Sequence, residues 1–179
     1  MVEVRREDEG APASRPNMDA VLGPATLDFE VAAWERLEAW TAYRWGERTV
    51  TWVVEGPGVW WPRLKPATVE TVEVWRDGAW TDTTLNAAPL GFELQAETYR
   101  VTATVGDTSD PPQGFMEAYR RLVEFMAAIE QDPAPAHSSG TDGDYSFTRP
   151  AGWAAKAIHL SGAADLLRTV LGFADAEPQ

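Results

Sequence analysis

The side chains that could support catalysis or bind a metal are few and widely separated in this sequence. The chain has no cysteine, which excludes disulfides and thiolate metal ligands. The two histidines, His137 and His159, have no partner at a metal-binding spacing, so we interpret His159 as a packing or surface residue. Residues Thr141 to Asp144 contain part of a calcium-loop pattern but lack its later oxygen ligands, and we predict a polar turn there.

Motifs of common active sites are not present either. The sequence contains no G-x-S-x-G, no Gly-rich phosphate loop and no H-E-x-x-H. Gly56-Pro57-Gly58 does not suit a dinucleotide, because Pro57 lacks an N–H and no helix is expected after it. Chance pairs of carboxylates are expected among 28 acidic residues, so a paired-acid hydrolase is the least favoured alternative. We predict a protein that is not an enzyme and uses no cofactor and no metal.

The charge balance argues against binding to nucleic acid. The chain has 15 Lys and Arg against 28 Asp and Glu, a net charge of −13. Phosphate binding requires clustered basic residues, and the only adjacent pairs are Arg5–Arg6 and Arg120–Arg121. We expect no specific nucleic-acid binding, even if DNA passes close by.

Membrane insertion is not expected. No run of about 18 apolar residues occurs, and the charged start MVEVRREDEG does not resemble a signal peptide.

Tryptophan is unusually frequent, with nine residues. Trp combines a large apolar ring with one N–H donor and is enriched at protein interfaces. The alternative is a small core filled with large rings. We expect core packing for most of the nine, and the remaining aromatic surface favours a protein that functions by packing against other proteins.

Helical spacing occurs in three segments. Residues 1–25 are polar and interrupted by Pro12, Pro16 and Gly23–Pro24, which predicts an extended arm. A helix is expected to begin at Thr26 and end at Gly46. A second helix is expected after Asp110-Pro111-Pro112 and should stop at Asp132-Pro133. A third is expected from Ala151 to Leu171.

Between the first two helices the pattern is that of β-strands. Strands are expected at Arg48–Val54, Val59–Leu64, Val69–Trp75 and Tyr99–Val105, with a weaker one at Gly91–Gln95. Asp77-Gly78 predicts a tight hairpin.

The predicted fold class is α+β, with two long helices packed on a small antiparallel β-meander, an extended N-terminal arm and a C-terminal docking helix. The expected organisation is an arm (1–25), a helix–β–helix adaptor core (26–131), a flexible linker (132–150), a C-terminal helix (151–172) and a tail (173–179). The predicted core consists of Leu37, Trp40, Val72, Val101, Leu122, Met126 and Ile129.

Several segments resemble head–tail connector (adaptor) proteins of tailed bacteriophages, which also occur in phage-like gene transfer particles. The segment from Glu38-Ala39-Trp40-Thr41 to Arg48-Thr49-Val50-Thr51-Trp52 is similar to the helix end and first strand of that family. Trp61-Pro62-Arg63-Leu64 and the stretch from Val69 to Gly78 resemble its Pro-rich step and hairpin, and Tyr99 to Gly106 its last strand. The similarity extends from Glu38 to Glu130, with a weaker one from Leu160 to Leu167. One departure is the polar arm, which replaces an additional first helix.

The resemblance implies a structural virion protein made in the cytoplasm of the bacterial host. Such proteins form a ring, commonly of about twelve subunits, between the portal and the tail. The implied partners are further copies of the chain, the portal protein and a tail-side stopper or terminator protein. The ring would line the channel through which DNA leaves the head.

The C-terminal helix is expected to dock on the portal. It follows a breaker-rich linker, has a wide apolar face, and carries Lys156, His159 and Arg168 in an otherwise acidic chain. The alternative is an ordinary third helix that closes the core. The expected portal-docking residues are Trp153, Ile158, Leu160, Leu167 and Leu171.

A Trp-rich ligand- or carbohydrate-binding module is the main alternative function. Sugar rings stack on exposed aromatic side chains that lie in one plane. The candidates for such a platform are Trp60, Trp61, Trp75 and Trp80.

Overall fold

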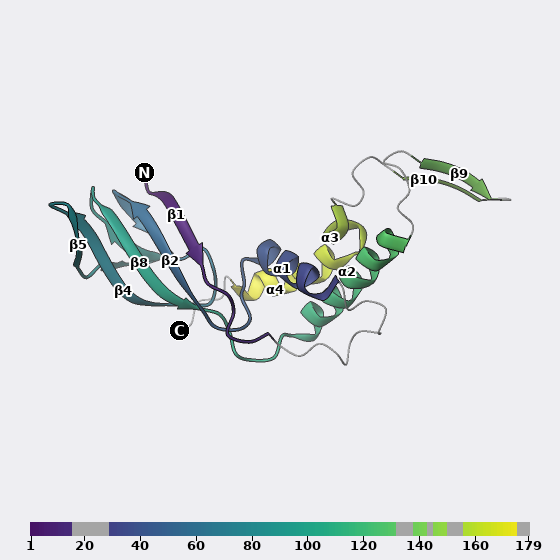
Figure 1. Ribbon diagram of the computed structural model, residues 1–179, viewed down its shortest axis with the longest axis horizontal. Coiled ribbons are helices and arrows are strands. Elements are labelled where there is room, and N and C mark those ends of the chain that lie inside the picture. Colours follow the sequence, from purple (N-terminus) through teal and green to yellow (C-terminus); the bar gives the residue numbers. More distant parts are fainter. Residues whose placement is uncertain (16–28, 132–137, 143–144, 150–155, 175–179) are drawn as a thin grey trace. The chain divides into compact units, whose positions relative to one another are not determined.

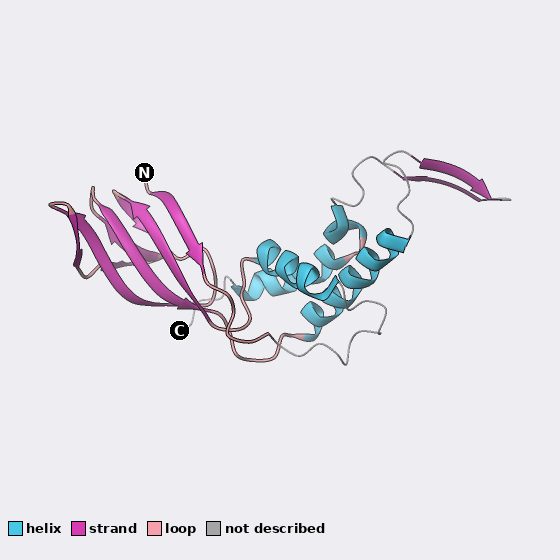
Figure 2. Ribbon diagram, in the orientation of Figure 1, coloured by secondary structure: helices cyan, strands magenta, loops and turns pink. Residues whose placement is uncertain are grey.

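The chain divides into two compact units. The computed structural model describes residues 1–15, 29–131, 138–142, 145–149 and 156–174 (Figure 1). One unit combines residues 1–16 with residues 42–110, and the other combines residues 17–41 with residues 111–179. Strands β1 to β8 belong to the first, the β unit, and helices α1 to α4 to the second, the helical unit (Figure 2).

The β unit contains a five-stranded sheet and a three-stranded sheet. The strands are β1 (Glu3–Glu9), β2 (Arg48–Glu55), β3 (Gly58–Trp60), β4 (Ala67–Arg76), β5 (Ala79–Asp82), β6 (Asn86–Ala88), β7 (Gly91–Leu94) and β8 (Thr98–Val105). The larger sheet has the order β1-β2-β8-β4-β5 and the smaller one β3-β7-β6. All neighbouring strands in both sheets pair antiparallel.

The core of the β unit is formed by residues from both sheets. Its buried members are Val50, Trp52, Val54, Trp60, Leu64, Val74, Leu94, Tyr99, Val101, Ala103 and Val105. Strand β8 lies between β2 and β4 and alternates buried with half-buried residues along its whole length. Since successive side chains of a strand point to opposite faces, one face of β8 is buried in the core, and the strand predicted at Tyr99–Val105 is confirmed.

The predicted hairpin at Asp77-Gly78 is confirmed. It joins β4 to β5, with Trp75 opposite Trp80. Asp77 has φ 52° and Gly78 has φ 81°, as expected for a two-residue turn in which both central residues are left-handed.

In the helical unit, α1 and α4 both pack on α2. Its helices are α1 (Glu30–Thr41), α2 (Gln113–Gln131), α3 (Ala157–Leu160) and α4 (Ala163–Ala174). The ring of Trp34 meets those of Phe115 and Tyr119 edge-on, at centroid distances of 5.2 and 5.7 Å. Leu122 of α2 and Leu167 of α4 are completely buried. A hairpin of β9 (Ser138–Asp142) and β10 (Tyr145–Arg149) follows α2, within the segment predicted to be a linker.

The predicted fold class is wrong. The protein is mainly antiparallel β-sheet with one long helix and several short ones, and it is not a pair of long helices on a small meander. The helices pack on one another within the helical unit, and the two sheets share a core of their own. The predicted single core is therefore wrong, because the protein has two cores. Leu37 and Leu122 are buried in the helical unit, and Val101 is buried in the β unit.

Four of the predicted core residues are less buried than expected. Trp40 is 42% exposed, whereas its neighbour Trp34 is 3% exposed and takes the central position. Val72, Met126 and Ile129 are only partly buried. Trp34 and not Trp40 is the buried tryptophan because α1 packs on α2 through the face that carries Ala33, Trp34 and Leu37. Trp40 lies outside this face.

The first helix is shorter than predicted at its C-terminal end. It ends at Thr41, and Ala42 is left-handed with φ 55°. Residues 43–48 instead join the β unit, where Tyr43 forms a bridge with Lys65 and Trp45 one with Asp107. Burial and the charge of Asp107, which accepts a hydrogen bond from Tyr43 Oη at 2.7 Å, raise the pKa of Tyr43 to about 12.

Gly46 has a different role from the helix stop that was predicted. Its φ is 82°, and a Cβ atom at this position would lie 1.9 Å from the carbonyl oxygen of Ser14. Glycine is therefore required at position 46 so that the backbone that follows β1, at Ser14, can pass close to it. In the same segment, the backbone N–H groups of Gly10 and Ala13 donate to the carbonyls of Thr49 and Glu47.

The predicted third helix is divided into two. Ser161 and Gly162 separate α3 from α4, and Gly162 has φ 76°. The Ser161 hydroxyl accepts a hydrogen bond from the Ala163 N–H at 3.3 Å and so caps α4. The apolar spacing continues across the break, which is why periodicity alone predicted one helix.

The first part of the expected N-terminal arm is a strand of the larger sheet. Strand β1 pairs with β2 from Glu3–Glu55 to Glu9–Val50. It was missed because its side chains are almost all charged and exposed, a composition that protects the open edge of a sheet. The remainder of that arm, residues 16–25, lies outside the described residues.

Three side chains fix the end of β1. Arg44 Nε and Arg48 Nη1 both donate to Glu9 Oε1, at 2.7 and 2.8 Å. Both guanidinium groups are buried, and the Glu9 side chain is 27% exposed. Burial alone would raise the pKa of Glu9, but the hydrogen bonds and charges of Arg44 and Arg48 outweigh it and hold this pKa below the ordinary 4.5. Two residues earlier, Glu7 accepts a hydrogen bond from Trp52 Nε1 at 2.6 Å.

Replacing Glu9 should therefore destabilise the β unit in a pH-dependent way. Glu9→Gln is expected to reduce the free energy of unfolding by about 1–3 kcal/mol at neutral pH, because two buried guanidinium groups lose their carboxylate. The folded-state pKa of Glu9 is depressed, so its contribution is complete above the unfolded-state value and is lost as the pH falls through the folded-state value.

Denaturant titrations at neutral and strongly acidic pH provide the measurement. Glu3→Gln is a matched control, since Glu3 lies on the same strand with an exposed side chain. Equal losses for the two variants at neutral pH would contradict the role assigned to Glu9.

Candidate protein-binding pocket

A pocket of about 730 Å³ lies between α1 and α3 within the helical unit. Its volume is within the range of sites that bind ligands. Helix α1 contributes Arg36, Ala39 and Trp40 to its lining. The start of α3 contributes Lys156, Ile158 and His159.

The sequence of α1 explains why these residues line the pocket. Its residues alternate in pairs, with Ala33–Trp34 and Leu37–Glu38 buried and Glu35–Arg36 and Ala39–Trp40 exposed. Residues three or four apart lie on one face of a helix, so Arg36, Ala39 and Trp40 form a single exposed face while Trp34 and Leu37 pack inward.

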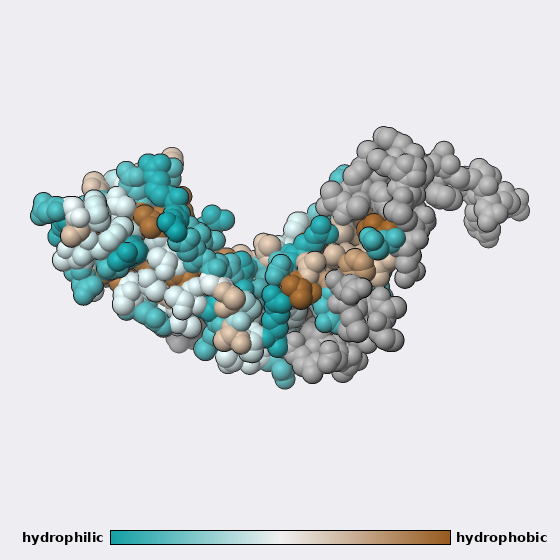
Figure 3. Space-filling view, in the orientation of Figure 1, coloured by the Kyte–Doolittle hydropathy of each residue, from teal (hydrophilic) through white to brown (hydrophobic). Residues whose placement is uncertain are grey.

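An aromatic contact joins the two helices across the pocket. The ring centroids of Trp40 and His159 are 5.0 Å apart, and the two ring planes meet edge-on at an angle of 88°. This geometry leaves much of the Trp40 side chain, 42% exposed, available for further contact. The exposed Leu160, at 48%, directly follows His159. Apolar groups on the surface of the molecule appear in Figure 3 among a mostly hydrophilic background.

The charge of the pocket is opposite to that of the chain. Within the described ranges, neither Arg36 nor Lys156 forms an ion pair. By contrast, Arg120 and Arg121 on the surface of α2 both bond to Glu117, at 2.8 and 2.7 Å, and lower the pKa of that carboxyl to about 2. No residue in the described part of the chain therefore occupies the two pocket cations.

The chemistry of the pocket suits a ligand that is both acidic and apolar. Guanidinium and ammonium groups bind carboxylates, and an exposed indole offers apolar area together with a ring face. Arg and Trp are also the side chains that contribute most often to the centre of protein interfaces. The arrangement favours an acidic protein segment that carries an apolar or aromatic residue.

The expected portal-docking residues occupy different environments. Ile158 lines the pocket and Leu160 is exposed beside it. Leu167 is completely buried, so in this conformation it helps to hold α4 in the helical unit. Trp153 lies outside the described residues, and Leu171 belongs to α4 but its side chain is not among those described. The structure thus brings two of the five to an accessible surface.

Sequence reasoning missed the contribution of α1 to this pocket. Lys156 and His159 had been noted for their charge, but Arg36 was not considered and Trp40 was assigned to the core. The sequence does contain a signal for this α1 surface. Arg36 precedes Trp40 by one helical turn and lies on the opposite side of the helix from Trp34, so Arg36 and Trp40 share an exposed face if Trp34 is buried.

The four Trp residues considered for sugar binding do not form a flat platform. Trp60 is buried in the β-unit core. The rings of Trp75 and Trp80 are inclined by 63°, and the guanidinium of Arg100 lies 4.7 Å from the Trp80 ring centroid. A cation over one ring and two inclined planes disfavour stacking of a sugar chain.

Among the described residues, no group of three or more His, Asp or Glu side chains is placed to hold a metal ion. No helix in the described part of the chain is long and apolar enough to cross a membrane.

Comparison with known proteins gives no relative for this chain. No protein-family model, curated protein or solved structure matches it.

Two Trp residues on α1 provide a test of which face of this helix is the core. Trp34→Ala should reduce the free energy of unfolding by about 3–5 kcal/mol, because the ring is buried against α2. Trp40→Ala, six residues later on the exposed face, should cost about 1 kcal/mol or less. Denaturant titration monitored by circular dichroism measures both, and a larger loss for Trp40→Ala would contradict the assignment.

Proposed function

We propose that this chain is a structural virion protein, the subunit of a connector ring between the portal and the tail of a tailed phage or a phage-like gene transfer particle. It acts by binding proteins and carries out no chemistry. The resemblance of residues 38–130 to the connector family is one support for this proposal. The observation that carries it is the distribution of exposed apolar side chains over both units.

Each unit offers its own surface for contact. On the helical unit, Trp40 is exposed in the pocket and Leu160, which follows the pocket residue His159 in the sequence, is also exposed. On the β unit, Trp61, Trp75 and Leu90 are exposed at 53%, 46% and 68%. Large exposed apolar side chains mark interaction sites when they lie together. Two unlike surfaces on one chain permit head-to-tail contacts, and such contacts produce rings when the rotation closes.

The electrostatics of the β unit suit a wall along which DNA passes without being held. On the larger sheet, Arg100 is paired with Glu73 at 2.5 Å, and Arg5 with Glu55 at 2.8 Å. Arg76 is likewise paired with Glu97 at 2.7 Å. Carboxylates that occupy the guanidinium groups prevent them from binding phosphate, and the net charge of −13 repels the duplex.

The proposal predicts a ring that binds the portal. Purified chain, alone or mixed with portal-bearing heads that lack a tail, should give annular particles in electron micrographs. On heads, the additional density should lie at the portal vertex, where a stopper or terminator protein would later bind. Chain that stays monomeric and never labels the portal vertex would contradict the proposed function.

Duplex DNA should not be retained by the isolated protein. In a gel-retardation experiment at physiological salt we expect no shift, because the basic side chains of the sheet are neutralised by neighbouring carboxylates. A shift that disappears as salt is added would instead indicate phosphate binding. A control protein of opposite net charge verifies that the assay detects weak electrostatic binding.

A further inference from the structure

We infer that the pocket between α1 and α3 binds the β4–β5 hairpin of a second copy of this chain. The inference rests on the proposed function, since it identifies the contact that joins neighbouring subunits of the ring. It is argued from the two surfaces, which carry opposite charges and both expose tryptophan.

The pocket side of the contact requires an acidic partner. Arg36 and Lys156 have no ion pair among the described residues, and Trp40, which lines the same pocket, is 42% exposed. Two copies that each carry a net charge of −13 repel one another. Association is therefore favoured where carboxylates of one copy meet the basic groups of another.

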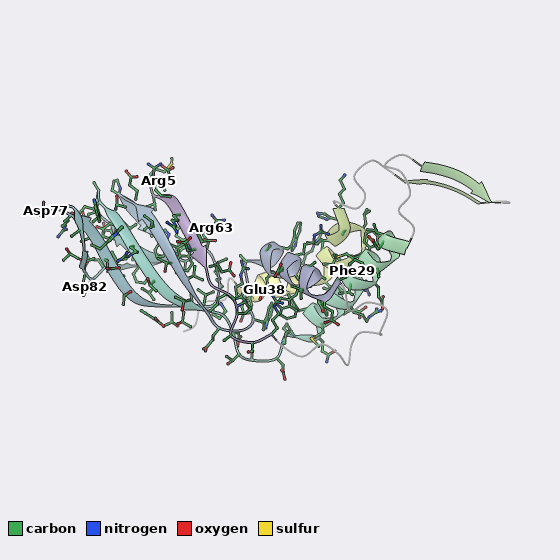
Figure 4. The ribbon with its side chains drawn as sticks, in the orientation of Figure 1. Arg5, Phe29, Glu38, Arg63, Asp77 and Asp82 are labelled. Atoms are coloured by element: carbon green, nitrogen blue, oxygen red, sulfur yellow. The ribbon has the colours of Figure 1, made fainter. Side chains whose placement is uncertain are left out.

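The hairpin side of the contact has the matching chemistry. Asp77 at its turn and Asp82 at the end of β5 are exposed, and neither forms an ion pair with a described residue. Both lie at the β4–β5 end of the larger sheet (Figure 4). Trp75 is 46% exposed and lies beside them, so the hairpin presents an indole together with two carboxylates.

The hairpin is also held rigidly, which reduces the entropic cost of binding. Four residue pairs align β4 with β5, from Glu73–Asp82 to Arg76–Ala79. Trp75 packs edge-on against Trp80 with centroids 5.1 Å apart, and Trp80 in turn lies under Arg100. The backbone of the hairpin and the ring of Trp75 are thereby held in place before a partner arrives.

This contact is of the head-to-tail type. The pocket belongs to the helical unit and the hairpin to the β unit, so each copy offers one of each and can bind two neighbours. Heterologous contacts of this kind generate rings or open chains. The pocket and the hairpin are thus sufficient, in principle, to propagate an assembly of many copies.

The test uses one charge reversal on each surface. Arg36→Glu alters the pocket and Asp82→Lys alters the hairpin. Arg63→Glu and Glu93→Lys make the same changes of charge at exposed residues of the β unit outside both surfaces. Sedimentation velocity at low ionic strength over a concentration series measures self-association, and circular dichroism verifies that every variant is folded.

We expect wild type and both controls to self-associate alike, whereas Arg36→Glu and Asp82→Lys each weaken association by about tenfold or more. A mixture of these two variants decides the geometry. Each retains one intact surface that fits the intact surface of the other variant, and the two reversed surfaces are again opposite in charge, so the mixture should associate beyond dimers although neither variant does so alone. A Trp75→Ala chain should show the same loss as Asp82→Lys.

Other outcomes would overturn the inference. Wild type that does not self-associate excludes the contact, as does equal association of Arg36→Glu and Arg63→Glu. If Arg36→Glu still forms rings but no longer binds the portal vertex, the pocket serves the portal instead, and the proposed function stands without this contact. If the variants behave as expected but wild-type rings never bind the portal, the contact stands and the proposed function fails.

Discussion

The ion pairs around Glu9 join the end of β1 to a segment of the β unit, Arg44 to Arg48, that is distant from it in the sequence. Arg44 lies in the segment that leaves α1, Arg48 begins β2, and Glu9 ends β1. Arg48 also donates hydrogen bonds to the carbonyls of Trp45 and Gly46. Its side chain therefore also fixes the course of the backbone between Arg44 and Arg48. This charged strand has little apolar surface, and besides these ion pairs it is kept on the sheet edge by its backbone pairing with β2, the Trp52–Glu7 hydrogen bond and the Arg5–Glu55 ion pair. The two buried guanidinium groups supply the additional stabilisation, and they require a carboxylate because an unpaired buried charge is costly.

Local signals predicted most individual elements of this protein. The alternation around Val101, the Asp77-Gly78 turn and the two prolines before α2 act through neighbouring residues, and each was placed correctly. The assembly of these elements was not predictable in the same way. The end of α1 is determined by contacts of Tyr43 and Trp45 with residues far along the chain, and β1 has no apolar alternation to reveal it.

The pocket was partly within reach of the sequence. Its basic residues on α3 had been noted, but its α1 wall depends on which of two tryptophans is turned inward. Trp34 and Trp40 both fit an apolar helical stripe, and only the packing of Trp34 between Phe115 and Tyr119 decides between them. In the proposed contact between two copies, the helical unit contributes the exposed ring of Trp40 and the β unit contributes the exposed ring of Trp75. In an assembly of identical chains joined in this way, each proposed contact would have an exposed tryptophan on both sides, and the opposite charges of the two surfaces would bring the pocket of one copy to the hairpin of the next.

The order of strands in the larger sheet has a consequence for folding during synthesis. The central strand β8 is the last of the five in the sequence, although it pairs with both β2 and β4. Until it leaves the ribosome, the pair β1–β2 and the hairpin β4–β5 are separate, and isolated two-stranded sheets of this size are only marginally stable in water. Without β8, the apolar side chains of Trp52 and Val74 lack the β8 residues that complete the core of the β unit. Nucleation of the β unit therefore awaits Val105, and nascent chains shorter than this expose aggregation-prone surface to the chaperones of the cell.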